Sequence, residues 1–183
     1  RTFLEADLMG FNTHGLHRVA SNLQWLEDGT SRREGEPDVL SDCGAIFSWD
    51  ANFLPGPWVC HLALEQAIQR AKTHGLAACV IRRSQHMACL AAYLPRILEA
   101  ELLGLITCST PSENTVNDFG GIDPIFSANP IAMAIPSEDD PIFFDVSMSI
   151  TAGGHVARAA REGTMLTENC LLGNSGKPSN KPQ

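Results

Sequence analysis

The sequence predicts an α/β fold in which a helical N-terminal portion precedes a mixed β-sheet flanked by helices. Apolar residues recur with helical spacing within residues 1–28, which indicates an amphipathic helix. Residues 76–81 form an unbroken apolar run, which is typical of a strand covered on both faces. A helical stretch at 87–103 and a second apolar strand at 104–107 follow. The order strand, helix, strand predicts a βαβ unit of a parallel or mixed sheet.

Turn-forming residues set the limits of the remaining elements. Pro57 is suited to the first position of a helix, and Gly75 is suited to the position after its end. Pro95 falls inside the predicted helix 87–103, which it should kink or end early. The other predicted elements are a loop at 31–37, a strand at 45–49, a helix from 57 to about 74, a loop at 109–124, strands at 131–135 and 142–146, and a short helix ending near Gly163.

Composition excludes several classes of function. The 183 residues are 44% hydrophobic, which is enough to bury the core of one domain or a small pair. The net charge is -8 and there is no basic run, so neither nucleic acid nor an anionic membrane is an expected partner. No apolar run is long enough to cross a bilayer. The six cysteines are dispersed without a C-x-x-C pair, which favours free thiols and a cytoplasmic location.

Two histidines lie in settings that packing explains poorly. His14 follows Thr13, and His86 comes shortly after the predicted strand 76–81, where ligands bind in α/β sheets. An imidazole titrates near neutrality and can pass a proton in either direction. Arg18 is four residues after His14, on the same helical face, and a guanidinium clamps a carboxylate through two parallel bonds. Together these residues predict an enzyme that handles a small acid and moves a proton.

Other interpretations of the same residues stay open. His14 also fits an exposed position on a helix, Arg18 an ordinary salt bridge, and His86 a helix cap. His14 and His17 are spaced to share a helical face, but no acidic or cysteine ligand follows at a known spacing, so we predict no metal site. A metal-dependent hydrolase built on the three histidines is therefore the weakest alternative. No G-x-G-x-x-G follows a strand, so the common dinucleotide fingerprint is absent.

Four blocks of sequence resemble the malate/L-lactate dehydrogenase family of the sulfolactate dehydrogenase type, which includes diketogulonate reductases and ureidoglycolate dehydrogenases. Residues 6–18 are similar to the family pattern A-D-x-x-G-x-x-S-H-G-x-x-R, and residues 83–86 to R-N/S-S/A-N-H. Residues 119–136 are similar to W/F-G-G followed by G-T-N-P and an apolar strand. Residues 145–149 are similar to D-M-S/A-T/M-S. The resemblance spans nearly the whole chain.

The resemblance implies a non-Rossmann NAD(P)-binding fold and the reduction of a small 2-oxo acid or cyclic imine acid by NADH or NADPH, or the reverse oxidation. His14 would be the proton donor to the substrate, helped by the hydroxyl of Thr13. Arg18 would hold the substrate carboxylate, and His86 would be the second active-site histidine. The residues implied to contact the cofactor, NAD or NADP, are Thr110, Asp145, Val146 and Ser147.

The resemblance also implies a division of the chain and an assembly. Residues 1–50 are expected to form the helical, substrate-binding portion and residues 51–183 the α/β cofactor-binding portion, in a homodimer. The chain opens at Arg1 inside a helical pattern and closes on a polar tail, so we expect a protein shortened at both ends relative to the family. Gln85 and Ser127 depart from the family pattern. The alternative is therefore a truncated or degenerate homologue without catalytic activity.

Overall fold

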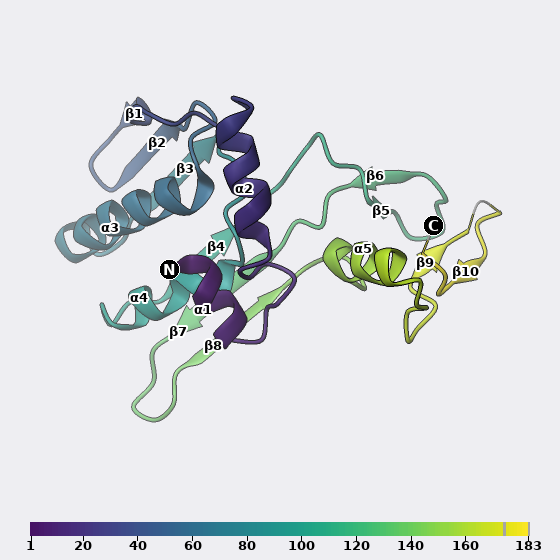
Figure 1. Cartoon of the computed structure of the whole chain (residues 1–183). Coiled ribbons are helices and arrows are strands. Elements are labelled where there is room, and N and C mark those ends of the chain that lie inside the picture. Colours follow the sequence, from purple (N-terminus) through teal and green to yellow (C-terminus); the bar gives the residue numbers. More distant parts are fainter. Residues whose placement is uncertain (174, 183) are drawn as a thin grey trace. The chain divides into compact units, whose positions relative to one another are not determined.

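The computed structural model describes residues 1–173 and 175–182, which form α-helices and several small β-sheets (Figure 1). The chain divides into two compact units. The first unit comprises Arg1–Gly104 and Met133–Phe144, and the second comprises Leu105–Ala132 and Asp145–Gln183. The predicted α/β class is confirmed. Asp50, where the sequence analysis ends its first portion, is the last residue of a strand within the first unit.

A three-stranded sheet in the first unit supports the segment that carries His86. Its strands are β1 (Asp38–Asp42), β2 (Ile46–Asp50) and β3 (Ala78–Arg82), in the order β1-β2-β3. β1 is antiparallel to β2, whereas β2 is parallel to β3. Helix α3 (Gly56–His74) connects the two parallel strands and lies along this sheet (Figure 1). The βαβ unit of the first unit is therefore β2-α3-β3.

The limits of α3 agree with the sequence analysis. Pro57 lies in its first turn, where the missing proline N–H is not needed for a helical hydrogen bond. Gly75 follows the last residue with φ 83°, a left-handed conformation that costs glycine little because it has no Cβ. The Gly75 N–H donates to the carbonyl of Ala71 and so satisfies one of the last carbonyls of the helix.

The βαβ unit predicted between residues 76 and 107 is wrong. β4 (Gly104–Thr107) belongs to a different sheet from β3, with strand order β4-β7-β8. The connection is not one helix, because the 3-10 turn Leu90–Tyr93 is followed only by the short helix α4 (Leu94–Leu98). Pro95 lies in the first turn of α4, so the proline begins this helix instead of kinking it.

Two further expectations are corrected. The N-terminal residues form two helices, α1 (Thr2–Leu8) and α2 (Arg18–Glu27), and the loop between them carries His14. β3 is not covered on both faces, since the side chain of Val80 is 65% exposed and exposed residues alternate along the strand. An apolar run by itself does not show how many faces of a strand are packed.

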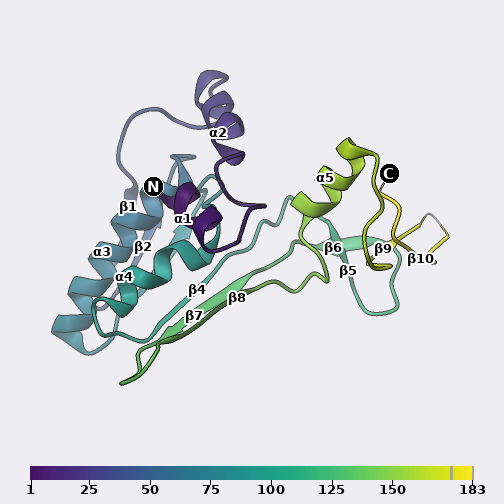
Figure 2. The same cartoon turned by 60° about the horizontal axis from the view of Figure 1, so that its bottom comes forward.

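The strands β7 (Ile131–Ile135) and β8 (Ile142–Val146) have the predicted bounds and form a hairpin around the predicted acidic turn (Figure 2). Helix α5 also ends as predicted, before the left-handed Gly163. The predicted loop at 109–124 contains one short strand. The remaining elements are α5 (Gly153–Glu162), β5 (Val116–Asn117) paired with β6 (Pro124–Phe126), and β9 (Leu171–Leu172) paired with β10 (Pro178–Ser179).

One buried cluster of the first unit joins Ala6 of α1 to Cys89, Ala91 and Ala92, which follow His86, and Met9 and Phe11 pack against it. The largest fully buried side chains of the first unit are Tyr93, Phe47, Leu54, Leu90, Leu94, Val59 and Asp50. Among the described residues, no helix combines the length and the apolar character that a membrane span requires.

We expect Gly56→Ala to lower the free energy of unfolding by about 1–3 kcal/mol, because overpacking forces a backbone shift. A Cβ at Gly56 would lie 2.2 Å from the carbonyl oxygen of Gln85 and 2.6 Å from that of His86. Gly153→Ala is the matched control, since Gly153 is also the first residue of its helix and a Cβ there meets nothing within 4 Å. Urea unfolding of both variants tests this; equal stabilities would contradict it.

Candidate active site

The imidazole rings of His14 and His86 stack against each other in the first unit. Their centroids are 5.4 Å apart and their planes are inclined by 13°. One ring comes from the loop between α1 and α2, and the other from the segment that follows β3. Two histidines that are distant in the sequence therefore lie side by side in the structure.

A carboxylate and a glycine shape the loop that carries His14. The side chain of Asp7 accepts a hydrogen bond from the backbone N–H of Leu16, at 2.9 Å from Oδ2. A Cβ at Gly15 would lie 1.7 Å from Oδ1 of Asp7, so any other residue would displace this carboxylate. The His14 N–H also donates to the carbonyl of Phe11. Asp7 and Gly15 of the first sequence block therefore close the turn that presents His14.

Thr13 and Arg18 lie against the same loop. The Thr13 hydroxyl is 2.9 Å from Nδ1 of His14, and Thr13 is only 7% exposed. Nε of Arg18, the first residue of α2, donates to the backbone carbonyl of Thr13 at 3.3 Å. Thr13, His14 and Arg18 are thus joined by short contacts, and His86 stacks on His14. The charge of Arg18 also acts on His86. These are the four residues that the resemblance places around the substrate.

The segment that carries His86 is attached to the first unit by backbone contacts. The backbone N–H of Gln85 donates to the carbonyl of Leu54, and its side-chain amide donates to the carbonyl of Thr30 at 2.6 Å. The backbone N–H of Ala88 donates to Nδ1 of His86 at 3.2 Å. Because Nδ1 accepts this bond, the hydrogen of the neutral ring is on Nε2.

The surroundings of His86 oppose a positive charge on its ring. Burial, as the largest cause, and the positive charges of Arg18, His14 and His17 together lower the pKa of His86 to about 4. His86 is therefore neutral at pH 7. A neutral imidazole with its hydrogen on Nε2 can donate a hydrogen bond to a substrate oxygen. It is not an imidazolium, so it has no extra proton to transfer.

The candidate cofactor residue Thr110 lies in the second unit and is attached to the segment 127–130. Its backbone N–H donates to the Ser127 hydroxyl at 3.1 Å, and this hydroxyl donates to Oδ1 of Asn129 at 2.6 Å. The N–H of Met148 donates to the carbonyl of Ala128, which is also in this segment. The sequence analysis named Ser127 only as a departure from the family pattern and did not single out Asn129. A hydroxyl at the position of the family glycine was the available signal.

The other candidate cofactor residues occupy the end of β8 and the turn after it. Asp145 is partly buried, whereas Val146 is 52% exposed. The Ser147 hydroxyl lies 3.0 Å from that of Ser149. Burial raises the pKa of the Cys108 thiol, and the negative charge of Asp145 raises it further. Thr110, Asp145, Val146 and Ser147 thus all lie in the second unit, whereas the candidate catalytic residues lie in the first.

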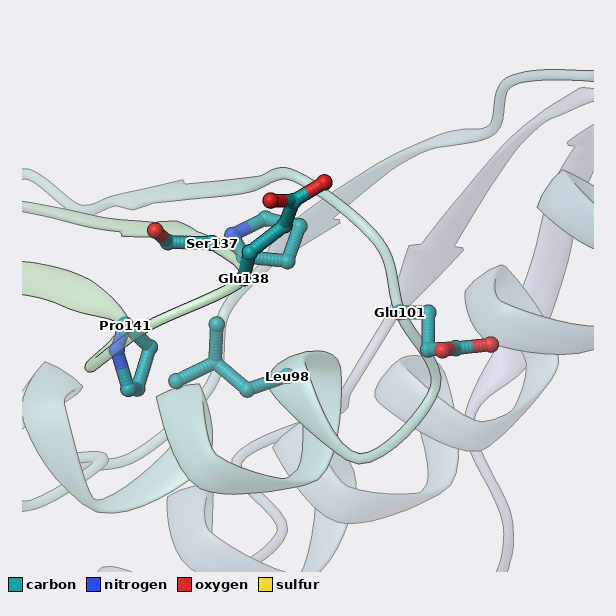
Figure 3. A pocket seen from close by; sticks show the side chains of 6 residues that line it. Leu98, Glu101, Ser137, Glu138 and Pro141 are labelled. Atoms are coloured by element: carbon teal, nitrogen blue, oxygen red, sulfur yellow. The ribbon is translucent and has the colours of Figure 1, made fainter.

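Two hollows have linings that include none of the candidate site residues. In the first unit, α4 and the turn between β7 and β8 border a hollow in which Leu98 points toward Pro141 (Figure 3). Its lining residues are Leu98, Glu101, Pro136, Ser137, Glu138 and Pro141. A hollow in the second unit is lined by Ile150, Thr151, His155, Met165, Leu166, Thr167, Glu168 and Cys170. Among the described residues, no group of three His, Cys, Asp or Glu side chains is placed to hold a metal ion.

Comparison with known proteins identifies the class of the fold. L-sulfolactate dehydrogenase of Methanothermobacter thermautotrophicus is 31% identical over 180 residues, which cover 98% of this chain and 52% of the relative. Ureidoglycolate dehydrogenase (NAD(+)) of Escherichia coli O157:H7 is 28% identical over 180 residues, which cover 97% of this chain and 50% of the relative. The crystal structure of malate dehydrogenase from Entamoeba histolytica matches with a TM-score of 0.91 at 26% identity, covering 99% of this chain and 50% of that chain. All three proteins are dehydrogenases.

The family follows from the whole length of the chain. A sequence profile of the family described as malate/L-lactate dehydrogenase matches residues 1–183. The chain belongs to the malate/L-lactate dehydrogenase family. It spans about half the length of the curated relatives that it matches.

The neutral state of His86 predicts a pH dependence of stability. Because folding lowers the pKa of His86 from 6.5 to about 4, its contribution is fully present above pH 6.5 and is lost as the pH falls toward 4. We expect a loss of about 2–3 kcal/mol over this window that His86→Asn does not show. Urea unfolding of both proteins from pH 4 to 7 measures the difference. Parallel curves would contradict it.

Proposed function

We propose that the protein is an NAD(P)-dependent oxidoreductase that interconverts a small 2-oxo acid, or a cyclic imine acid, and the corresponding 2-hydroxy or amino acid. The observation that carries this proposal is the stacked pair of His14 and His86 beside Arg18, within blocks that resemble the family pattern. The names of the relatives support the class of reaction, since they include dehydrogenases of hydroxy acids and a Delta(1)-pyrroline-2-carboxylate reductase.

The acid is recognised by the positive side of the site. Arg18 offers a planar fork of donors that matches a carboxylate. His17, at the start of α2, is close enough for its charge to act on His86 as well. A substrate anion bound here would be attracted by these groups although the chain carries a net charge of -8.

His14 is proposed to donate the proton to the substrate oxygen, or to the imine nitrogen, during reduction. The transferred proton leaves from Nε2, while Nδ1 keeps its hydrogen bond to the Thr13 hydroxyl at 2.9 Å. A hydroxyl can accept this bond both before and after the transfer, so Thr13 holds the ring in one orientation throughout. His86 remains neutral and donates a hydrogen bond from Nε2 to the oxygen on which charge develops.

The second unit offers donors and acceptors that fit a nicotinamide cofactor. Thr110 and Ser147 would offer hydroxyls, Asp145 a carboxylate and Val146 an apolar side chain to a bound nicotinamide cofactor. The segments of Thr110 and Ser147 are both attached to residues 127–130, which keeps these groups together. A bound NADH or NADPH would supply the hydride. In this proposal the fold binds NAD(P) without a Rossmann domain.

The proposal also assigns a function to each of two portions of the chain, and it includes an oligomeric state. Residues 1–50 would contribute substrate binding and residues 51–183 cofactor binding, in a cytoplasmic homodimer. A catalytically inactive homologue is not favoured, because the matched relatives are dehydrogenases. Fluorescence titration with NADH and NADPH separates the two, since a folded protein that binds neither cofactor would fit the inactive homologue.

Removing the proton donor should nearly abolish the reaction. We expect His14→Ala in the full-length protein to lower kcat by about 10²–10⁴-fold with a panel of 2-oxo acids and NADH or NADPH. His74→Ala is the control, because His74 is an exposed residue at the end of α3. Turnover of His14→Ala within a factor of about two of the control would overturn the proposed role.

Arg18→Lys should mainly weaken capture of the acid. Lysine keeps the positive charge but lacks the planar fork, so we expect KM to rise by about 10–100-fold while kcat falls much less. Steady-state kinetics with the acid varied at saturating cofactor measure the split. An unchanged KM would assign the carboxylate to another residue.

A further inference from the structure

We propose that Asp50 and Arg83 are positioning residues that hold the imidazole of His86 in place against His14. The proposal rests on the proposed function of His86, but its contacts are all within the first unit. Asp50 was not singled out by the sequence analysis, and the mechanism above does not use it.

Asp50 is a buried carboxylate at the end of β2, with only 2% of its surface exposed. Its oxygens accept hydrogen bonds from the backbone N–H of Asn52, from Nε of Arg82, and from Nε and Nη2 of Arg83. The two bonds to Arg83, at 2.8 and 2.6 Å, form the forked geometry that is stronger than a single contact. Arg83 also lowers the pKa of Asp50 far below its usual range, so the carboxylate is charged.

Arg83 is the residue at which the chain turns out of β3 toward His86. Its φ is 53°, a left-handed conformation that a residue with a side chain adopts only at a cost. Its backbone carbonyl accepts a hydrogen bond from Phe53, which is itself left-handed with φ 62°. Nη2 of Arg83 also donates to Oδ1 of Asn52. The ion pair with Asp50 therefore stabilises an unfavourable turn.

The residues between Arg83 and Ala88 are held by a further set of contacts. Gln85 is bonded through its backbone and its amide, as described above, and the carbonyls of Gln85 and His86 pack against Gly56. At the far end, the buried hydroxyl of Tyr93 donates to the carbonyl of Met87. Arg83 is the left-handed residue directly after β3, at the point where the chain changes direction. A different turn there would move His86 relative to the ring of His14.

Arg82 provides an internal comparison because it binds the same carboxylate. It contributes one bond, from Nε at 2.8 Å, and its side chain is 63% exposed. Arg82 is the last residue of β3 and is not among the left-handed residues. Loss of a guanidinium bond to Asp50 is therefore common to changes at both arginines, whereas an effect on the turn is specific to Arg83.

The test compares Arg83→Lys with Arg82→Lys in the full-length protein, using the ¹⁵N and ring-proton NMR signals of His86 across a pH titration. The His86 signals are assigned by their loss in His86→Asn. In Arg83→Lys we expect the pKa of His86 to rise from about 4 toward 6.5, because the ring moves away from the buried position and from Arg18, His14 and His17. In Arg82→Lys we expect the pKa to stay where it is.

Kinetics provide the second measurement. We expect kcat of Arg83→Lys to fall by about tenfold with little change in KM for the acid, since Arg18 is untouched, and Arg82→Lys to behave as wild type. If the two variants shift the His86 pKa equally, or if neither does, the proposal is overturned. Should Arg83→Lys not fold, Asp50→Glu applies the same NMR comparison. The NMR comparison does not require turnover, so it tests this proposal even if the protein has no dehydrogenase activity.

Discussion

The contact between the two imidazoles depends on two carboxylates that shape the segments on either side of it. Asp7 closes the loop of His14 around a glycine that no other residue can replace without displacing the carboxylate. Asp50 holds the turn from which the chain runs to His86. Neither carboxylate is proposed to touch a substrate. The candidate site is therefore built on acidic groups, although the side chains that it presents are basic.

The low pKa of His86 is a condition for the stacked arrangement. Two parallel imidazolium rings at 5.4 Å would repel each other, and Arg18 would add a third positive charge. Keeping one ring neutral removes most of this repulsion and leaves the other free to change its protonation state during a reaction. Burial and nearby positive charges keep His86 neutral, so His86 is suited to donating a hydrogen bond and not to transferring an extra proton.

The sequence predicts the bounds of a helix or strand well when residues next to that element determine where it begins and ends. The helix from Gly56 to His74 and the strands 131–135 and 142–146 follow from turn residues and apolar runs. The pairing of β3 with β2, in place of β4, depends on contacts between distant residues, which periodicity does not report. The same limit applies to the site. His14, His86 and Arg18 stand out by type, whereas Asp50 gains its role only through Arg83, 33 residues away.

The departures from the family pattern argue for a working site, because each is accommodated by a specific contact. Gln85 replaces the family asparagine, and its longer amide reaches the carbonyl of Thr30. Ser127 replaces a glycine, and its hydroxyl accepts the N–H of Thr110 while donating to Asn129. Buried polar groups that lost their purpose would be expected to lack partners, yet no buried side-chain polar atom among the described residues is without one. Both substitutions keep hydrogen-bond partners, so they preserve the local structure of the segments that carry them.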